Sequence, residues 1–319
     1  MQRRSLLLGA ALVATPQLAR AAPRPIGWIS IEPAGSISEF LAALRTGLAG
    51  AFPPGVEPPQ VLDRTATDPP SVAAAVKELQ DQGVNLIVSQ GGASPLVVRA
   101  KPAVPVVFAF SGDPVVAGMV DSLARPGGNA TGMTFMSIEL SPKRLGLARE
   151  LVPGCRKVAL FANRRHPGEE KEIASFQEAV QKIGIELAVH RVQTQDEAAA
   201  AAREALGAGT QAVLALSSAG MLQQTPAIAA VFGERKVPVI GGWASFARHG
   251  ATLSYGTNLL ECYRRIAWYV ARVLGGTAPS TLPIEQPSMF ELVINKKTVQ
   301  SLGLALPPTL LAQADEVIE

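Results

Sequence analysis

Small polar residues and glycines follow several apolar segments of this chain, at points where a strand would end. Ser111-Gly112-Asp113 follows the apolar segment 105–110, and Gln90-Gly91-Gly92-Ala93 follows the segment 86–88. Serine hydroxyls and unpaired backbone N–H groups at helix starts suit a carboxylate, because the helix dipole also favours negative charge there. The carboxylate of Asp113 suits the opposite partner, an ammonium group. These residue types suit a small ligand that carries a carboxylate, an ammonium group or both.

Equivalent loops recur in the second half of the chain. Ser217-Ser218 follows the apolar segment 212–216, and Trp243 follows the segment 237–240 after two glycines. The indole ring of Trp243 would stack on an aromatic or apolar ligand. Each of these residues also has a plain structural interpretation, because serine and aspartate form turns and helix caps, and large aromatic side chains fill cores. The residue types alone do not separate the two interpretations.

The sequence contains no motif for catalysis, metal binding or nucleotide binding. It has no Gly-x-Ser-x-Gly elbow, no phosphate-binding P-loop and no Gly-x-Gly-x-x-Gly turn after a strand. Its three histidines share no spacing typical of metal ligands. We therefore expect no catalytic residue, no metal and no cofactor, and an exported α/β hydrolase is the weaker alternative.

Strand and helix patterns alternate along most of the chain. Val72, Ala75, Val76 and Leu79 form an apolar helical stripe that ends near a glycine, and the segment 173–183 repeats this plan in the second half. Alternation with short connections predicts parallel sheets flanked by helices. Right-handed crossovers then place the carboxyl ends of the strands of each half on one edge, where the polar loops would meet.

The last part of the chain returns after two complete strand–helix series, which predicts several crossings between two lobes. We expect the strands Thr131–Phe135 and Leu253–Thr257 to form a hinge. The predicted N-terminal lobe comprises residues 22–133 and about 257–276. The predicted C-terminal lobe comprises residues 134–256 and about 277–319.

A cleft between two such lobes would be lined by strand ends from both halves and by residues near the hinge. The residues that we expect to contact a ligand there are Ser30, Glu32, Ser36, Gln90, Gly91, Gly92, Ala93, Ser111, Asp113, Phe135, Asn163, Ser217, Ser218, Trp243 and Tyr255.

The N-terminus has the pattern of a cleaved export signal. Arg3-Arg4 precedes a short apolar run, Leu6 to Val13, and Ala19-Arg20-Ala21 resembles a cleavage site. We expect residues 1–21 to be removed, by the twin-arginine route or by the general secretory route, and the protein to be periplasmic.

Charge and cysteine content exclude some partners. Arg3, Arg4 and Arg20 account for the whole formal net charge of +3, so the rest of the chain carries no basic excess of the kind that nucleic-acid binding requires. Cys155 and Cys262 lie far apart in the sequence, and two unpaired thiols are the preferred interpretation over a disulfide.

Several motifs spread over essentially the whole chain after the signal resemble one family, the ABC transporter substrate-binding proteins related to tryptophan- and tyrosine-binding proteins. The motifs are Ser111-Gly112-Asp113-Pro114-Val115, Gly118, Ser122-Leu123, the run Arg125 to Gly132, Lys143-Arg144-Leu145, the run Glu150 to Gly154, Ser254-Tyr255-Gly256, and the tail Pro287 to Asn295 with Gly303 and Pro307-Pro308.

The resemblance implies an α/β fold of the class I periplasmic-binding type, with two Rossmann-like lobes that carry parallel sheets and are joined by a multi-crossing hinge. It implies a protein that closes on a small ligand by hinge motion and delivers it to an ABC permease in the inner membrane. A monomer suits docking to such a permease. The implied ligand is an aromatic or other amino acid, or a related small carboxylate. A ligand-sensing subunit for a membrane receptor is the main alternative.

Overall fold

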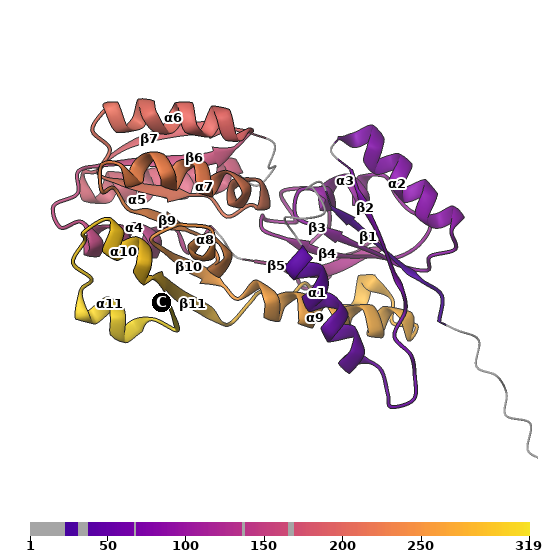
Figure 1. Ribbon diagram of the computed structural model, residues 1–319. Coiled ribbons are helices and arrows are strands. Elements are labelled where there is room, and N and C mark those ends of the chain that lie inside the picture. The colour runs from indigo at the N-terminus through magenta and orange to yellow at the C-terminus, as the bar shows by residue number, and fades with distance from the viewer. Residues whose placement is uncertain (1–22, 31–37, 67, 136–137, 165–168) are drawn as a thin grey trace, which may run out of the picture.

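The computed structural model describes residues 23–30, 38–66, 68–135, 138–164 and 169–319. They form two lobes side by side, each built around one β-sheet (Figure 1). The first lobe, in indigo and purple, holds most of the chain up to β5. The second lobe, from magenta to yellow, holds α4 and most of the later elements, and it also contains the C-terminus.

The first sheet has five parallel strands, and its central strands are buried on both faces. All residues of β1, β3, β4 and β5 are buried, as expected for apolar segments covered by helices on both sides. Along the sheet the order is β2 (Val61–Thr65), β1 (Ile26–Ser30), β3 (Ile87–Gln90), β4 (Val106–Phe110) and β5 (Ala130–Thr134). The helices α2 (Pro69–Asp81) and α3 (Ala93–Arg99) connect these strands, and Asp68 caps α2 as part of a capping box.

The second sheet has seven strands and is almost entirely parallel. The order is β12 (Glu316–Ile318), β11 (Phe290–Asn295), β10 (Leu253–Thr257), β9 (Val239–Gly241), β8 (Ala212–Ala215), β6 (Lys157–Asn163) and β7 (Glu186–Val192). Only the pairing of β10 with β11 is antiparallel among these described strands. The expected fold of two α/β lobes is confirmed.

The second lobe contains seven of the described α-helices. They are α4 (Ser141–Leu151), α5 (Glu169–Ile183), α6 (Gln195–Gly207), α7 (Ala219–Gly233), α8 (Ala244–Arg248), α10 (Lys296–Ser301) and α11 (Pro308–Gln313).

A long late helix belongs to the first lobe although it follows the second sheet in sequence. This helix, α9 (Leu259–Leu274), packs along α1 (Ser38–Ala51) and against β4 and β5 (Figure 1). The close approach depends on Gly47, because a Cβ atom there would lie 2.6 Å from the Arg264 carbonyl oxygen. Tyr263 and the other buried residues of α9 form one apolar face, so burial of that face fixes the helix against the first sheet.

The chain passes between the lobes three times within the described residues. The crossings follow β5, β10 and Glu285, and the Thr257 hydroxyl joins the first two by donating to the Phe135 carbonyl (2.9 Å). Because the crossings are bonded to one another, the lobes share a hinge rather than a single flexible linker.

One boundary expected from the sequence is wrong. The predicted C-terminal lobe includes residues from about 277 onward, but the segment that includes the short helix η2 (Pro279–Thr281) follows β5 of the first sheet. The Glu285 N–H donates to the Gly132 carbonyl, and the Glu285 carbonyl accepts from the Thr134 N–H. Extended backbone next to an edge strand pairs with it, so this stretch stays with the first lobe until Glu285.

Two further features concern the described residues as a whole. Cys155 and Cys262 are buried and unpaired, and burial raises the pKa of the Cys262 thiol to about 12. None of the described helices combines the length and the hydropathy needed to cross a bilayer.

Candidate ligand-binding site

The first lobe presents two strand-end loops toward the second lobe. Gln90 ends β3 and is buried, and Gly91 turns the chain into α3 with a φ of 54°, a conformation that glycine adopts without strain. The turn is held by the Gly91 N–H, which donates to the Ala109 carbonyl on β4 (2.8 Å). Ala93 is fully buried under this turn. The second loop, Ser111-Gly112-Asp113, follows β4 directly.

The second lobe presents the loops after β8 and β9. The Ser218 hydroxyl caps α7 by accepting from the Met221 N–H (3.2 Å), and the Ser217 hydroxyl donates to Glu172 Oε1 (3.2 Å). Trp243 begins α8 and is 3% exposed. Both serine hydroxyls therefore have partners inside their own lobe. Ser218 is a helix cap, as the structural interpretation predicted, whereas Ser217 bonds to a buried carboxylate on another helix.

A small enclosed cavity lies where these loops meet. Its walls come from both lobes and the hinge, and its volume is about 10 Å³. The lining residues are Gln90, Gly91, Gly92, Ser111, Phe135, Ala219, Trp243, Leu259 and Tyr263. Gln90 Oε1, Trp243 Nε1 and the Tyr263 hydroxyl are buried and have no hydrogen-bond partner among the described residues. Unsatisfied buried polar atoms are costly, so three of them around one cavity indicate a place that a polar ligand or water completes.

The Tyr263 hydroxyl and the Gln90 side chain lie near each other in this cavity. Burial raises the pKa of Tyr263, and the Gln90 side chain opposes that rise, although the two groups do not reach hydrogen-bond geometry. Sequence analysis missed Tyr263, because its position on the apolar stripe of α9 gave no signal beyond that of a core residue.

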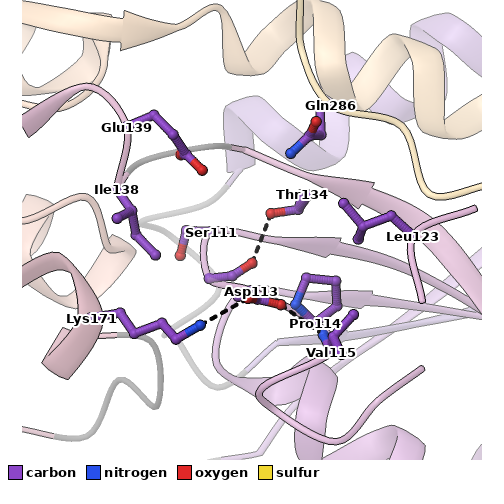
Figure 2. Close-up of a pocket in the computed structure, with 11 residues that line it drawn as sticks. Ser111, Asp113, Pro114, Val115, Leu123, Thr134, Ile138, Glu139, Lys171 and Gln286 are labelled. Atoms are coloured by element: carbon purple, nitrogen blue, oxygen red, sulfur yellow. Dashed lines mark hydrogen bonds and ion pairs between the residues drawn. The ribbon is translucent and has the colours of Figure 1, made fainter. Parts of the chain in front are cut away.

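A larger cavity of about 510 Å³ opens beside the small one, and Ser111 lines both (Figure 2). Residues of the first lobe form one wall, and Ile138, Glu139 and Lys171 approach from the side of the second lobe. The Thr134 hydroxyl donates to the Gly112 carbonyl (2.7 Å), which holds the loop after β4 against the hinge strand.

Asp113 both caps the turn that follows it and forms an ion pair across the cleft. Its Oδ1 accepts from the N–H groups of Val115 (2.9 Å) and Val116 (3.2 Å), and its Oδ2 pairs with Lys171 Nζ of α5 (2.9 Å) across the larger cavity (Figure 2). Burial would raise the pKa of Asp113, but the Lys171 ammonium and the two backbone N–H groups outweigh it and hold the pKa below its ordinary value. Asp113 thus faces a cation of the protein itself, and its contact with a ligand ammonium group stays a prediction.

Contacts between described residues of the two lobes hold them together around the two cavities. Besides the pair of Asp113 with Lys171, Ser245 of α8 donates a short hydrogen bond to Glu39 of α1, and the rings of Phe40 and Trp243 meet edge to face at 6.4 Å. These contacts describe a closed arrangement of the cleft.

Replacing Lys171 by methionine should loosen the closed arrangement of the ligand-free protein. Both charges are partly exposed, so the pair contributes less than about 1 kcal/mol, which is enough to shift an open–closed equilibrium without unfolding a lobe. Small-angle scattering at neutral pH should give a larger radius of gyration for Lys171→Met than for the unmodified protein. Lys77→Met removes an ion pair inside α2 and should leave the radius unchanged.

Low pH should break the same ion pair between Asp113 and Lys171. The folded-state pKa of Asp113 lies below its ordinary value of 3.8, so the pair is fully present above that pH and is lost as the pH falls through the lower folded value. Scattering of the unmodified protein should then approach that of Lys171→Met, while circular dichroism checks that both remain folded. A Lys171→Met variant as compact as the unmodified protein at neutral pH would rule out this role.

A buried ion pair lies below the second-lobe loops. Arg144 of α4 and Glu172 of α5 are 1% and 4% exposed, and Arg144 Nη1 lies 2.8 Å from Glu172 Oε1. Sequence analysis missed this pair, although a signal existed. Arg144 precedes the buried residues Ala148 and Leu151 by four and seven positions, so a charged residue stands on an apolar helical stripe.

Other predicted residues lie elsewhere or outside the described part of the chain. Glu32 and Ser36 fall in the segment that is not described. Ser30 is buried at the end of β1, and Asn163 ends β6; neither lines the two cavities. Tyr255 is absent from both cavities too, because its ring packs against Phe290 on the neighbouring strand.

The described residues contain no group of histidine, cysteine and acidic side chains that could hold a metal ion.

The sequence of this chain matches one protein-family model and one curated relative. A sequence model described as ABC transporter substrate binding protein matches residues 60–318. A curated relative named tyrosine-binding protein, from Clostridioides difficile (strain R20291), is 24% identical over 207 residues, which are 65% of this chain and 59% of the relative. The match therefore spans less than two thirds of the relative's length.

Similar solved structures extend over nearly the whole chain. A conserved domain protein from Vibrio cholerae has a TM-score of 0.83 at 23% identity and covers 93% of this chain and 99% of its own. The ABC domain from Streptococcus pneumonia in complex with L-Trp has a TM-score of 0.81 at 22% identity and covers 92% of this chain and 100% of its own. At these identities the likeness concerns the fold.

Proposed function

The chain belongs to the ABC transporter substrate-binding protein family, and from that premise we propose that it binds an aromatic amino acid between its two lobes. Its family makes it the solute-binding component of an ABC transporter and not an enzyme. The names of the tyrosine-binding relative and of the structure that holds L-Trp support an aromatic amino acid. We also propose export to the periplasm, with residues 1–21 as the signal, and transfer of the ligand by the monomer to a membrane permease.

The observation that carries the proposal is the pair of opposite charges on facing walls of the larger cavity. Asp113 belongs to the first lobe and Lys171 to the second, and the cavity of about 510 Å³ lies in the size range of small-molecule sites. The head group of an amino acid carries both charges. Its ammonium group would replace Lys171 at Asp113, and its carboxylate would replace Asp113 at Lys171, so closure on the ligand keeps every charge paired.

The aromatic side chain of the ligand would extend from this head-group site toward the small cavity. Ser111 lines both cavities, so the two form one continuous site when the lobes move apart. Phe135, Trp243 and Tyr263 offer aromatic surface for the ring, and Gln90 Oε1 offers an unused acceptor for an indole N–H or a phenol O–H.

Binding by this route requires hinge motion. A volume of about 10 Å³ corresponds to roughly one water molecule, so the small cavity as it stands has no room for an aromatic ring. The ligand would enter with the lobes apart, and the interlobe contacts described above would re-form or adjust around it.

The test is a thermal-shift and calorimetry panel on protein that has been unfolded and refolded to remove carried-over ligand. The panel holds tryptophan, tyrosine and phenylalanine, with tryptamine and indole-3-propionate as matched compounds that lack the carboxylate or the ammonium group. A ligand at 100 times its dissociation constant adds about 2.7 kcal/mol of stability. We expect shifts with the amino acids and much weaker ones with the two matched compounds. No shift with any of the amino acids would overturn the ligand assignment, and equal binding of tryptamine or indole-3-propionate would overturn the head-group site.

A further inference from the structure

The buried ion pair of the second lobe holds the backbone of every described second-lobe loop that reaches the small cavity. Arg144 Nε donates to the Tyr255 carbonyl (2.8 Å), and Nη2 donates to the Gly242 carbonyl (3.4 Å). Glu172 accepts from the Ser217 hydroxyl (3.2 Å) and from the Ser217 N–H (3.4 Å). Two side chains thus connect three segments that are far apart in the sequence.

Each of these segments continues directly into a part of the cleft. Gly242 precedes Trp243, and Ser217 precedes the cap of α7, where Ala219 lines the small cavity. Tyr255 lies on β10, which leads to Thr257 and its hydrogen bond to the Phe135 carbonyl at the hinge. Arg144 and Glu172 therefore line neither of the two cavities, but they are bonded to the wall of the small cavity and to a strand that leads to the hinge.

We propose that Arg144 and Glu172 are positioning residues that set the second-lobe half of the ligand site and its relation to the hinge. The part of this inference that concerns ligand affinity rests on the proposed function, whereas the part that concerns loop position does not. Lys171, the neighbour of Glu172 on α5, reaches across to Asp113, so the same pair also fixes the helix that carries the interlobe contact.

The backbones of these loops pack closely beside the guanidinium group. A Cβ atom on Gly256 would lie 1.7 Å from the Gly242 carbonyl oxygen, and one on Gly242 would lie 2.2 Å from Ser217 Oγ. The same two hypothetical atoms would lie 3.3 Å and 3.1 Å from Arg144 Nη2. The backbones of the β9 and β10 loops therefore meet directly at Arg144, and glycine is required at both positions.

Stability alone does not account for a pair of this kind. Desolvation of two charges offsets most of their attraction, and well-packed apolar residues of similar size often replace such a pair without loss of stability. An apolar pair would fill the space between α4 and α5 but would donate nothing to the Gly242 and Tyr255 carbonyls. Unlike an apolar pair, the ion pair of Arg144 and Glu172 therefore fixes the position of the loops.

The test compares the double variant Arg144→Met/Glu172→Leu with the unmodified protein. The double variant should unfold within about 4 °C of it. Amide hydrogen exchange in the ligand-free state should become at least tenfold faster at residues 241–246 and 255–257, with no change in α2 of the first lobe. The affinity for the best ligand of the panel should fall at least tenfold.

A second variant keeps the test decisive if the double variant does not fold. Glu172→Gln preserves the shape of the side chain and one acceptor oxygen, but its amide NH₂ cannot accept from the Ser217 N–H. Exchange should then rise at residues 217–221 in a folded protein. Unchanged exchange in the loops of either folded variant would overturn the proposal, and so would unchanged affinity when the exchange is faster. If the unmodified protein binds no ligand, the exchange data still decide the positioning role.

Discussion

Gly132→Ala should destabilise the first lobe by about 3 to 5 kcal/mol. Gly132 lies in β5 with a φ of 147°, which L side chains rarely adopt. A Cβ atom there would lie 2.0 Å from the carbonyl oxygen and 2.7 Å from the nitrogen of Phe108. Both atoms belong to the backbone of β4, so no side chain can rotate away, and the two strands would have to separate.

Gly132→Ala should also disturb the hinge between the lobes. The Gly132 carbonyl accepts from the Glu285 N–H, and β5 continues into the first crossing between the lobes, so a displaced β5 disturbs two crossings at once. Urea denaturation measures the effect. Gly128→Ala is the matched control, because nothing lies within 4 Å of a Cβ atom there, and its effect should stay within about 0.5 kcal/mol. Equal stability of the two variants would contradict the close approach of β5 to β4.

Gln90→Leu should weaken the binding of tryptophan and tyrosine by about ten- to hundredfold and leave phenylalanine nearly unchanged. Gln90 Oε1 is buried without a hydrogen-bond partner among the described residues, and our proposal assigns it to the N–H or O–H group of the ligand ring. A site that offers such an acceptor discriminates against a ligand that lacks the donor. The variant removes the acceptor and with it the discrimination.

The same substitution should raise the stability of the ligand-free protein, by about 1 kcal/mol, because it removes an unsatisfied polar atom. Isothermal calorimetry and urea denaturation measure the two effects. Gln60→Leu changes an exposed glutamine and should alter neither, and 1-methyltryptophan, which has no indole N–H, should bind both proteins alike. An equal loss for all three amino acids would place Gln90 at the head group instead, and no loss for any would place it outside the site.

Much of the fold and part of the site can be predicted from local patterns. The stripe Val72, Ala75, Val76 and Leu79 predicted α2 with its buried face, and these are the residues that the helix buries. The segments 86–88 and 105–110 predicted strands, and the loops after them do meet at the cleft. Gln90 and Ser111 were expected there for that reason, Trp243 because it follows the strand segment 237–240, and Phe135 because it lies near the hinge. Their use by a ligand stays a prediction.

Partnerships between distant residues could not be predicted from the same patterns. Nothing near Lys171 in the sequence indicates that it faces Asp113, because the contact depends on how the lobes are set by the three crossings. The segment 279–285 was assigned to the wrong lobe because an extended, proline-containing stretch carries no periodicity that ties it to one sheet.

The sequence by itself determined two α/β lobes, polar strand-end loops and the absence of a catalytic motif, because helical and strand periodicity and turn residues act over a few positions. The tertiary structure decided which charges meet. It paired Asp113 with Lys171 across the cleft and buried Arg144 with Glu172 beneath it. Around one cavity in the described part of the chain it left Gln90 Oε1, Trp243 Nε1 and the Tyr263 hydroxyl without hydrogen-bond partners. Such pairings depend on the geometry of the hinge and of packed helices, which brings together residues that are far apart in the chain.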